Sequence, residues 1–178
     1  MKKIQIGIMG SAADLNYGDD AEKFAKKVGE LIAKSGNILV YGAEKEYTSL
    51  STNAAIEASK NGGITVGITG EKDKKVFGEF LPDVLIPCGL GIGGGREFTL
   101  VLSCDVIIAI SGGSGTLTEI AIAYQAGIPI ITVPNFGGWA KKINNKYIDD
   151  RKRLKCIEAK TPEDAVKKAI KIYTKNDI

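Results

Sequence analysis

The sequence predicts an α/β fold, a single doubly wound, Rossmann-like domain over residues 1–178 with a mainly parallel sheet of six or seven strands. Short apolar, β-branched runs alternate with helical patterns along the chain, which favours parallel strands joined by helices. Glycines fall where helices should end, as at Gly36, Gly62 and Gly127. A length of 178 residues suits one domain that buries its core without disulfides or metal.

The expected elements follow from these patterns in chain order. Strands are expected at residues 3–9, 37–41, 64–69, 83–87, 105–110 and 128–133. Helices are expected at residues 19–35, 50–61, 95–104, 115–126 and 162–175. The polar stretch 70–82 has few periodic apolar positions and is expected to be a loop or a poorly formed helix. After Pro134 we expect a surface excursion with one short helical turn, and then an edge strand within 154–159.

Composition excludes several classes of protein. The chain is 44% apolar and 25% charged, and no apolar run approaches the length of a membrane span, so we expect a cytoplasmic protein without a membrane partner. It has no histidine, which excludes histidine base chemistry and the commonest zinc sites. The three cysteines lack metal-ligand spacing and are expected to be buried thiols, so no metal site is expected. A net charge of +3, with lysines spread among acids, gives no support for a nucleic-acid partner.

The ligand site of a doubly wound sheet lies beyond the carboxyl ends of the strands, where the strand order reverses. If the order is 3-2-1-4-5-6, that crevice lies between the first and fourth strands. Three glycine-containing loops would then border it, at residues 10–12, 88–96 and 111–116. From the first of these loops we expect Gly10 and Ser11 to contact the ligand.

The run SGGSGTLTE at residues 111–119 is the most informative stretch. Its glycines let the backbone turn sharply after an apolar strand, and the helix that follows adds its free N–H groups and positive dipole end, so the run is suited to an anion. The expected binding residues are Gly112, Gly113, Ser114, Gly115 and Thr116. An alternative interpretation is a capping box, with Thr116 as N-cap and Glu119 reaching back to it.

A second glycine loop, GLGIGGGRE, occupies residues 89–97 and includes a formal GxGxxG. The next strand does not end in the acid that a dinucleotide site needs, so NAD and FAD are not expected, and no P-loop motif or PLP lysine is evident. Binding is expected from Gly91, Gly93, Gly94 and Gly95. Arg96 could clamp a phosphate or carboxylate, or it could simply pair with Glu97 or another acid.

Residues 89–133, GLGIGGGREFTLVLSCDVIIAISGGSGTLTEIAIAYQAGIPIITV, resemble the molybdenum cofactor carrier protein family. That family is related to the cytokinin-activating phosphoribohydrolases, also called lysine-decarboxylase-like proteins. In those enzymes the matching arginine and glutamate are the catalytic pair, so the resemblance implies catalytic roles for Arg96 and Glu119. The chain departs from the family after the second strand, where Glu44 and Glu46 stand in place of a glycine-rich turn.

Three functions remain open at this stage. The first is a carrier or sensor that binds a phosphorylated, nucleotide-like or molybdopterin-like small molecule, with a nucleotide or the molybdenum cofactor as its ligand and no other cofactor required. The second is a phosphoribohydrolase that cleaves nucleoside 5′-monophosphates to base and ribose 5-phosphate. The third is a non-catalytic structural subunit. The helix face Ile120-Ala123-Tyr124 and the resemblance together imply a homo-oligomer, either a dimer or a tetramer.

Overall fold

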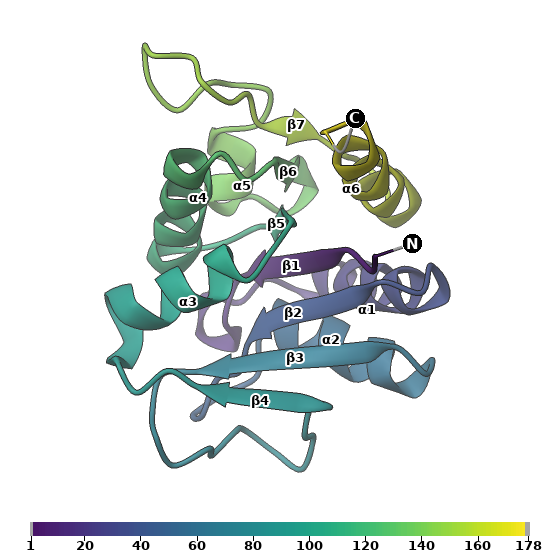
Figure 1. The fold of residues 1–178 in the computed structure, drawn as a ribbon, viewed down its shortest axis with the longest axis vertical. Helices are drawn as coiled ribbons and strands as arrows, with labels where there is room; N and C mark the ends of the chain where they lie inside the picture. Colours follow the sequence, from purple (N-terminus) through teal and green to yellow (C-terminus); the bar gives the residue numbers. More distant parts are fainter. Residues whose placement is uncertain (1, 177–178) are drawn as a thin grey trace.

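Seven parallel strands form one sheet in the order β4-β3-β2-β1-β5-β6-β7 (Figure 1). The computed structural model describes residues 2–176, apart from the side chains of Asp14, Ile92, Lys175 and Asn176 and the placement of Gly93. The strands are β1 Gln5–Gly10, β2 Ile38–Gly42, β3 Ile64–Thr69, β4 Val84–Pro87, β5 Val106–Ile110, β6 Ile130–Val133 and β7 Ile157–Glu158. The expected doubly wound, parallel sheet is therefore confirmed.

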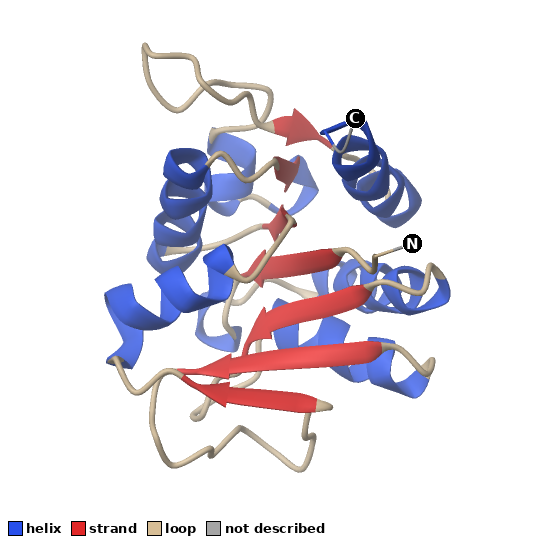
Figure 2. Cartoon of the chain, viewed as in Figure 1, coloured by secondary structure: helices blue, strands red, loops and turns tan. Residues whose placement is uncertain are grey.

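Helices cover both faces of this sheet (Figure 2). The helices are α1 Asp19–Lys34, α2 Leu50–Lys60, α3 Arg96–Leu102, α4 Ser114–Ala126, α5 Gly138–Lys142 and α6 Pro162–Asn176. Side chains of α1, α2 and α6 pack in one core cluster, and those of α3, α4 and α5 pack in the other. All five residues of β5 are buried between the two layers, as expected of a central parallel strand.

The first two helices illustrate how local sequence positions these layers. The first turn of α1 carries Asp19, Asp20 and Glu22, whose negative charges complement the helix dipole. Gly29 of α1 faces α2 so closely that a Cβ there would lie 1.9 Å from the Ala54 carbonyl oxygen. The two helices can therefore pack nearly backbone to backbone over the sheet.

The expected strand order 3-2-1-4-5-6 is wrong in one respect. The fourth strand in the chain, β4, pairs with β3 at the edge of the sheet, and it is β5 that pairs with β1. Residues 70–82 contain no helix, so the loop alternative is correct, and this connection delivers β4 to the adjacent edge position. Helix α3 then crosses back over the sheet and brings the chain to β5, which pairs with β1, so the order reverses between β1 and β5.

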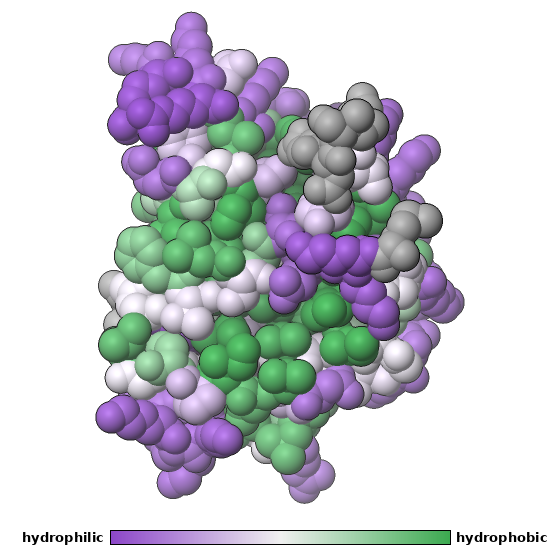
Figure 3. Space-filling model, in the orientation of Figure 1, coloured by the Kyte–Doolittle hydropathy of each residue, from purple (hydrophilic) through white to green (hydrophobic). Residues whose placement is uncertain are grey.

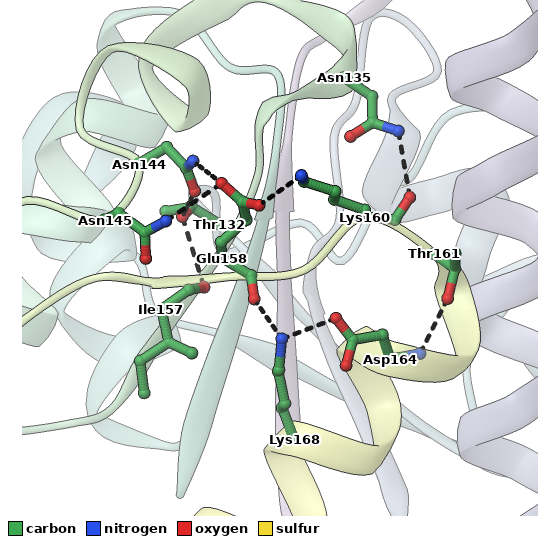
Figure 4. A network of polar contacts seen from close by, with 10 residues as sticks. All are labelled: Thr132, Asn135, Asn144, Asn145, Ile157, Glu158, Lys160, Thr161, Asp164 and Lys168. Carbon is green, nitrogen blue, oxygen red and sulfur yellow. Dashed lines mark hydrogen bonds and ion pairs between the residues drawn. The ribbon is translucent and has the colours of Figure 1, made fainter.

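A polar network holds the short edge strand β7 in place (Figure 4). Glu158 accepts hydrogen bonds from Asn144 and from Asn145, and its carboxylate lies 3.1 Å from the ammonium group of Lys160. The buried Thr132 hydroxyl of β6 donates to Asn144 over 2.8 Å. These bonds join β6, β7 and the loop after α5, so two residues of ladder pairing suffice to complete the sheet.

Several smaller expectations have outcomes in the structure. Cys104 and Cys156 are buried free thiols, as expected, whereas Cys88 is only half-buried. The expected helical turn after Pro134 is present as a 3-10 turn, Pro134–Phe136, followed by α5. No helix within residues 2–176 is both long enough and apolar enough to cross a membrane.

The helix face Ile120-Ala123-Tyr124 is not available for self-association. All three side chains are buried in the chain's own core, because α4 packs this face against the sheet. The Tyr124 hydroxyl reaches past the core and donates a hydrogen bond to Asp149. The expectation that this face pairs with another copy is therefore wrong.

Candidate functional site

The turns that follow β1 and β5 meet where the strand order reverses. Ser11, just after β1, links them: its hydroxyl accepts a hydrogen bond from the Gly112 N–H over 2.8 Å and donates one to the Ser111 hydroxyl over 3.0 Å. Both serines are buried, so these bonds form away from water, where losing one is costly. The two turns are thus fixed relative to each other.

The turn after β5 adopts an unusual backbone conformation. Ser111 has φ +58° and Gly112 has φ +102°, both in the left-handed region that L side chains rarely occupy. Helix α5 supports this turn from outside, since the N–H groups of Trp139 and Ala140 donate to the carbonyls of Gly112 and Ser111 over 2.9 Å each. Strain of this kind persists only where the surrounding structure holds it, and it is concentrated at functional sites.

Helix α4 begins directly after this turn with Gly113 as its N-cap. The N–H groups of a helix's first turn have no partner within the helix, and no side chain among the described residues caps these. Thr116 is the third helical residue, not the N-cap, which makes the capping-box interpretation wrong. The bare helix end therefore offers N–H donors and a positive dipole end to a ligand.

Glu119 lies one turn further along α4. It is 6% exposed, yet it makes no hydrogen bond or ion pair with the residues that the structure describes. Buried carboxyl groups in folded proteins nearly always have a partner. The Glu119 side chain lines a cleft at the bare helix N-terminus, where water or a bound molecule can supply the partner.

Arg96 and Glu97, the first residues of α3, bring a second group of charges to this region. Arg96 is 5% exposed, and its Nη1 donates to Glu44 Oε1 over 2.7 Å, while its Nη2 lies 3.3 Å from Glu97 Oε1. Glu97 Oε2 also accepts a hydrogen bond from the Gly94 N–H over 2.7 Å. The Arg96 Nε has no hydrogen-bond partner among the described residues. The alternative interpretation of Arg96, pairing with Glu97 and another acid, is thus what the structure contains.

These charges give the site an acidic character. Burial raises the pKa of Glu119 to about 8, the Arg96 guanidinium opposes this shift, and the carboxylates of Glu97 and Glu44 add to it. The site thus contains one buried guanidinium group, that of Arg96, and three carboxyl groups, those of Glu44, Glu97 and Glu119. Near neutral pH the least costly arrangement keeps Glu119 protonated, so that its carboxyl group can donate a hydrogen bond.

A cleft of about 340 Å³ lies at the meeting point of these elements. The residues that line it are Gly10, Ser11, Ala12, Leu15, Glu44, Tyr47, Glu97, Gly113, Ser114, Gly115, Thr116, Thr118 and Glu119. The bare end of α4 therefore lines the cleft together with a carboxyl wall, formed by the side chains of Glu44, Glu97 and Glu119. No group of three or more His, Cys, Asp or Glu side chains in the described part of the chain is placed to hold a metal ion.

Most of the residues expected at the site line this cleft. Those that do are Gly10, Ser11, Gly113, Ser114, Gly115, Thr116 and Glu119. Gly112 lies in the same turn but lines a neighbouring hollow with Trp139. Arg96 faces a smaller hollow on the far side of Glu44.

The second glycine loop has a different position from the one expected. Gly91, Gly94 and Gly95 belong to a π-helical turn, Gly91–Gly95, which follows β4 and leads into α3 without lining the cleft. Gly93, also expected to bind, lies outside the described residues. The sequence interpretation missed Tyr47 and the cleft-facing role of Glu97, for which the position next to Arg96 was the only signal.

Comparison with known proteins identifies relatives over nearly the whole chain. A model described as the SLOG cluster4 family matches residues 3–166. A protein of Archaeoglobus fulgidus is 34% identical over 127 residues, covering 71% of this chain and 78% of the relative. Two similar solved structures are the molybdenum cofactor binding protein of Rippkaea orientalis and the molybdenum cofactor carrier protein of Chlamydomonas reinhardtii. The Rippkaea protein is 28% identical with a TM-score of 0.80, and the match covers 97% of this chain and 98% of that one. The Chlamydomonas protein is 26% identical with a TM-score of 0.78, and the match covers 98% of this chain and 99% of that one.

The raised pKa of Glu119 predicts a stability that depends on pH. Between about pH 4.5 and pH 8 the unfolded chain has released this proton and the folded chain has not, so the free energy of unfolding falls as the pH rises. Glu119→Gln lacks this fall. In denaturant unfolding, the free energy of unfolding of Glu119→Gln relative to wild type should therefore increase by roughly 3–5 kcal/mol between pH 4.5 and pH 8, since one pKa unit is worth about 1.4 kcal/mol. Glu46→Gln, at an exposed site, should track wild type; a parallel course for Glu119→Gln would contradict the assignment.

Proposed function

The chain belongs to the SLOG cluster4 family, and on that premise we propose that it is a carrier or sensor that binds a phosphorylated, nucleotide-like or molybdopterin-like small molecule. The observation that supports this most directly is the uncapped N-terminus of α4, which opens into the cleft beside an unpartnered buried carboxyl group. Two structurally similar proteins are described as binding or carrying the molybdenum cofactor, which also favours a small-molecule binding role.

In this proposal the ligand's phosphate lies against the N–H groups of Ser114, Gly115 and Thr116. The protonated Glu119 then donates a hydrogen bond to the ligand, because its carboxyl group has no other partner among the described residues. The rigid turns around Ser11 hold this site before the ligand arrives, so little ordering is needed on binding. The backbone N–H donors would thus provide the affinity for the phosphate, and the carboxyl wall would determine which molecules can bind through the rest of their structure.

Placing a carboxylate at the start of α4 tests this anion site. A Cβ at Gly115 has open space, and an acid in the first turn stabilises a helix, so Gly115→Asp should fold at least as stably as wild type. The same charge should repel a bound phosphate and weaken nucleoside 5′-monophosphate binding at least about tenfold, or about 1.4 kcal/mol. Isothermal titration calorimetry measures this effect. Gln125→Glu adds an equal charge at the far end of α4 and should bind like wild type; equal binding by Gly115→Asp would refute the site.

Phosphoribohydrolase activity is the second candidate, and the isolated Glu119 carboxyl group favours it. In that reaction water adds to the ribose C1′, the N-glycosidic bond breaks, and the base leaves with a proton. Glu119 would stabilise the oxocarbenium-like centre or accept the proton of the water, and both roles require it first to lose the proton that it holds near neutral pH. Arg96, the other proposed catalytic residue, would need to be released from Glu44 before it could hold the phosphate or assist the leaving base.

One assay separates the two candidates. Wild type and Glu119→Gln are incubated with a panel of nucleoside 5′-monophosphates, and ribose 5-phosphate is measured. A carrier binds a panel member and releases no product, whereas a hydrolase releases product that Glu119→Gln reduces by about 10³-fold or more, the scale of a lost general acid or base. If no member binds or reacts with either protein, the structural-subunit alternative is favoured.

We also propose that the protein forms a homo-oligomer, through a different surface from the one first expected. Phe98 and Leu102 lie one turn apart on α3 and are 54% and 59% exposed. Val84 and Ile86 on β4 are also exposed, and Figure 3 shows apolar residues gathered over this face. A self-complementary patch of this kind fits a second copy related by a two-fold axis.

A charge on this face should prevent assembly. Leu102→Glu would bury a carboxylate against apolar side chains of the second copy, so light scattering should show a monomer where wild type gives a dimer or tetramer. Tyr147→Glu, an exposed aromatic position on the excursion before β7, serves as the control and should leave the mass unchanged. A monomeric wild type would contradict the proposal.

A further inference from the structure

We propose that Glu44 is a specificity residue whose carboxylate occupies the anion position of Arg96, and so confines the ligand's anionic group to the N-terminus of α4. This inference rests on the proposed binding function and assigns a role to the loop after β2, where Glu44 and Glu46 replace the glycine-rich turn of the family that the chain resembles. Glu44 lies just after β2, and its side chain is 16% exposed. It is therefore close enough to water to be displaced, yet it contacts a buried guanidinium.

The contacts of Arg96 support this role. A carboxylate or phosphate that fully matches a guanidinium binds it through two parallel N–H bonds. Glu44 instead uses only Nη1, Glu97 approaches only Nη2, and Nε is left without a partner among the described residues. The pairing is thus sufficient to neutralise the buried charge but leaves one donor unused. An incoming phosphate could satisfy that donor set better than Glu44 does.

Glu44 also forms part of the partition between two hollows. The larger is the cleft that Glu119 lines, and the smaller, about 140 Å³, is lined by Arg96. Only Glu44 and Tyr47 line both hollows. With Glu44 in place, a ligand in the cleft reaches the end of α4 and the carboxyl wall but not the guanidinium. Without it, Arg96 and Glu119 could face one molecule.

The backbone at this position does not depend on the side chain. The Glu44 carbonyl accepts a hydrogen bond from the Phe77 N–H over 2.8 Å, and the preceding Ala43 N–H donates to the Ile68 carbonyl over 2.9 Å. Both bonds persist when residue 44 is changed. A substitution therefore removes the carboxylate from Arg96 while the loop stays anchored, which makes the proposal testable.

The test is equilibrium dialysis with radiolabelled inorganic phosphate, which reports sites per chain and their dissociation constants. Wild type should bind one phosphate, at α4. Glu44→Gln should bind a second phosphate, at Arg96. Its dissociation constant there should be at least about tenfold lower than that of any binding at Arg96 in wild type, equivalent to about 1.4 kcal/mol. The double variant Glu44→Gln/Arg96→Gln should return to one site. Glu46→Gln removes the same charge from an exposed position in the same loop and should behave like wild type.

The outcomes distinguish a failure of the inference from a failure of the proposed function. A phosphate site that is present in Glu44→Gln, absent from wild type and dependent on Arg96 supports the inference. If wild type itself binds no phosphate, only the proposed function fails. A single site in both wild type and Glu44→Gln overturns the inference and leaves the α4 site standing. Absence of binding in both overturns both. Thermal unfolding verifies that each variant is folded, and Glu44→Ala, which removes the side chain altogether, must give the same site count.

Discussion

The hydrogen bonds of Ser11 to the turn after β5 are the interaction on which the site depends most. The parallel sheet brings β1 and β5 together with their carboxyl ends on one side, but it does not fix how the two turns lie. The Ser11 hydroxyl does this by accepting from Gly112 and donating to Ser111. Because the left-handed backbone at Ser111 and Gly112 directs the chain into α4, the position of the helix end follows from this contact. The cleft is thus built at the junction of two strands that are 100 residues apart in the chain.

The electrostatics of the site follow from where α3 begins. Helix α3 crosses from the edge strand β4 back towards β1, and its first two residues, Arg96 and Glu97, are buried against β2 and α4. A buried guanidinium requires counter-charges, and Glu44 and Glu97 supply them. Glu119 is buried in the same region of low dielectric, next to the carboxylates of Glu44 and Glu97. Its pKa is therefore raised, and it keeps its proton to a higher pH. The three acids thus act as one set, although only Glu119 belongs to the run SGGSGTLTE.

Local patterns predicted the parts of this protein that depend on local sequence. The parallel αβ architecture follows from alternating apolar runs, and the turn at residues 111–116 follows from its glycines, because only such a sequence fits that backbone. The order of β4 and β5 could not be predicted, since it depends on a helix-free connection and on a helix that crosses the sheet. The pairing of Glu44 with Arg96 spans 52 residues and has no local signal. The prediction for the Ile120 face was wrong because the apolar residues of α4 are not confined to one side of the helix, so its sequence does not show which side faces the core.

The unpartnered carboxyl group of Glu119 is the strongest reason to regard the cleft as functional. A glutamine, or an apolar residue of similar size, would remove the cost of burying an ionisable group next to Glu97 and Glu44. Purely structural demands on α4 would therefore favour such a replacement, because the helix needs no cap from this position and none of the described residues gains a hydrogen bond from it. Residues that weaken the folded state and serve no internal contact are typical of sites where binding or chemistry sets the sequence. The same argument applies to Arg96, whose charge makes Glu44 and Glu97 necessary and whose Nε remains unused. Both groups make physical sense when a ligand completes the arrangement.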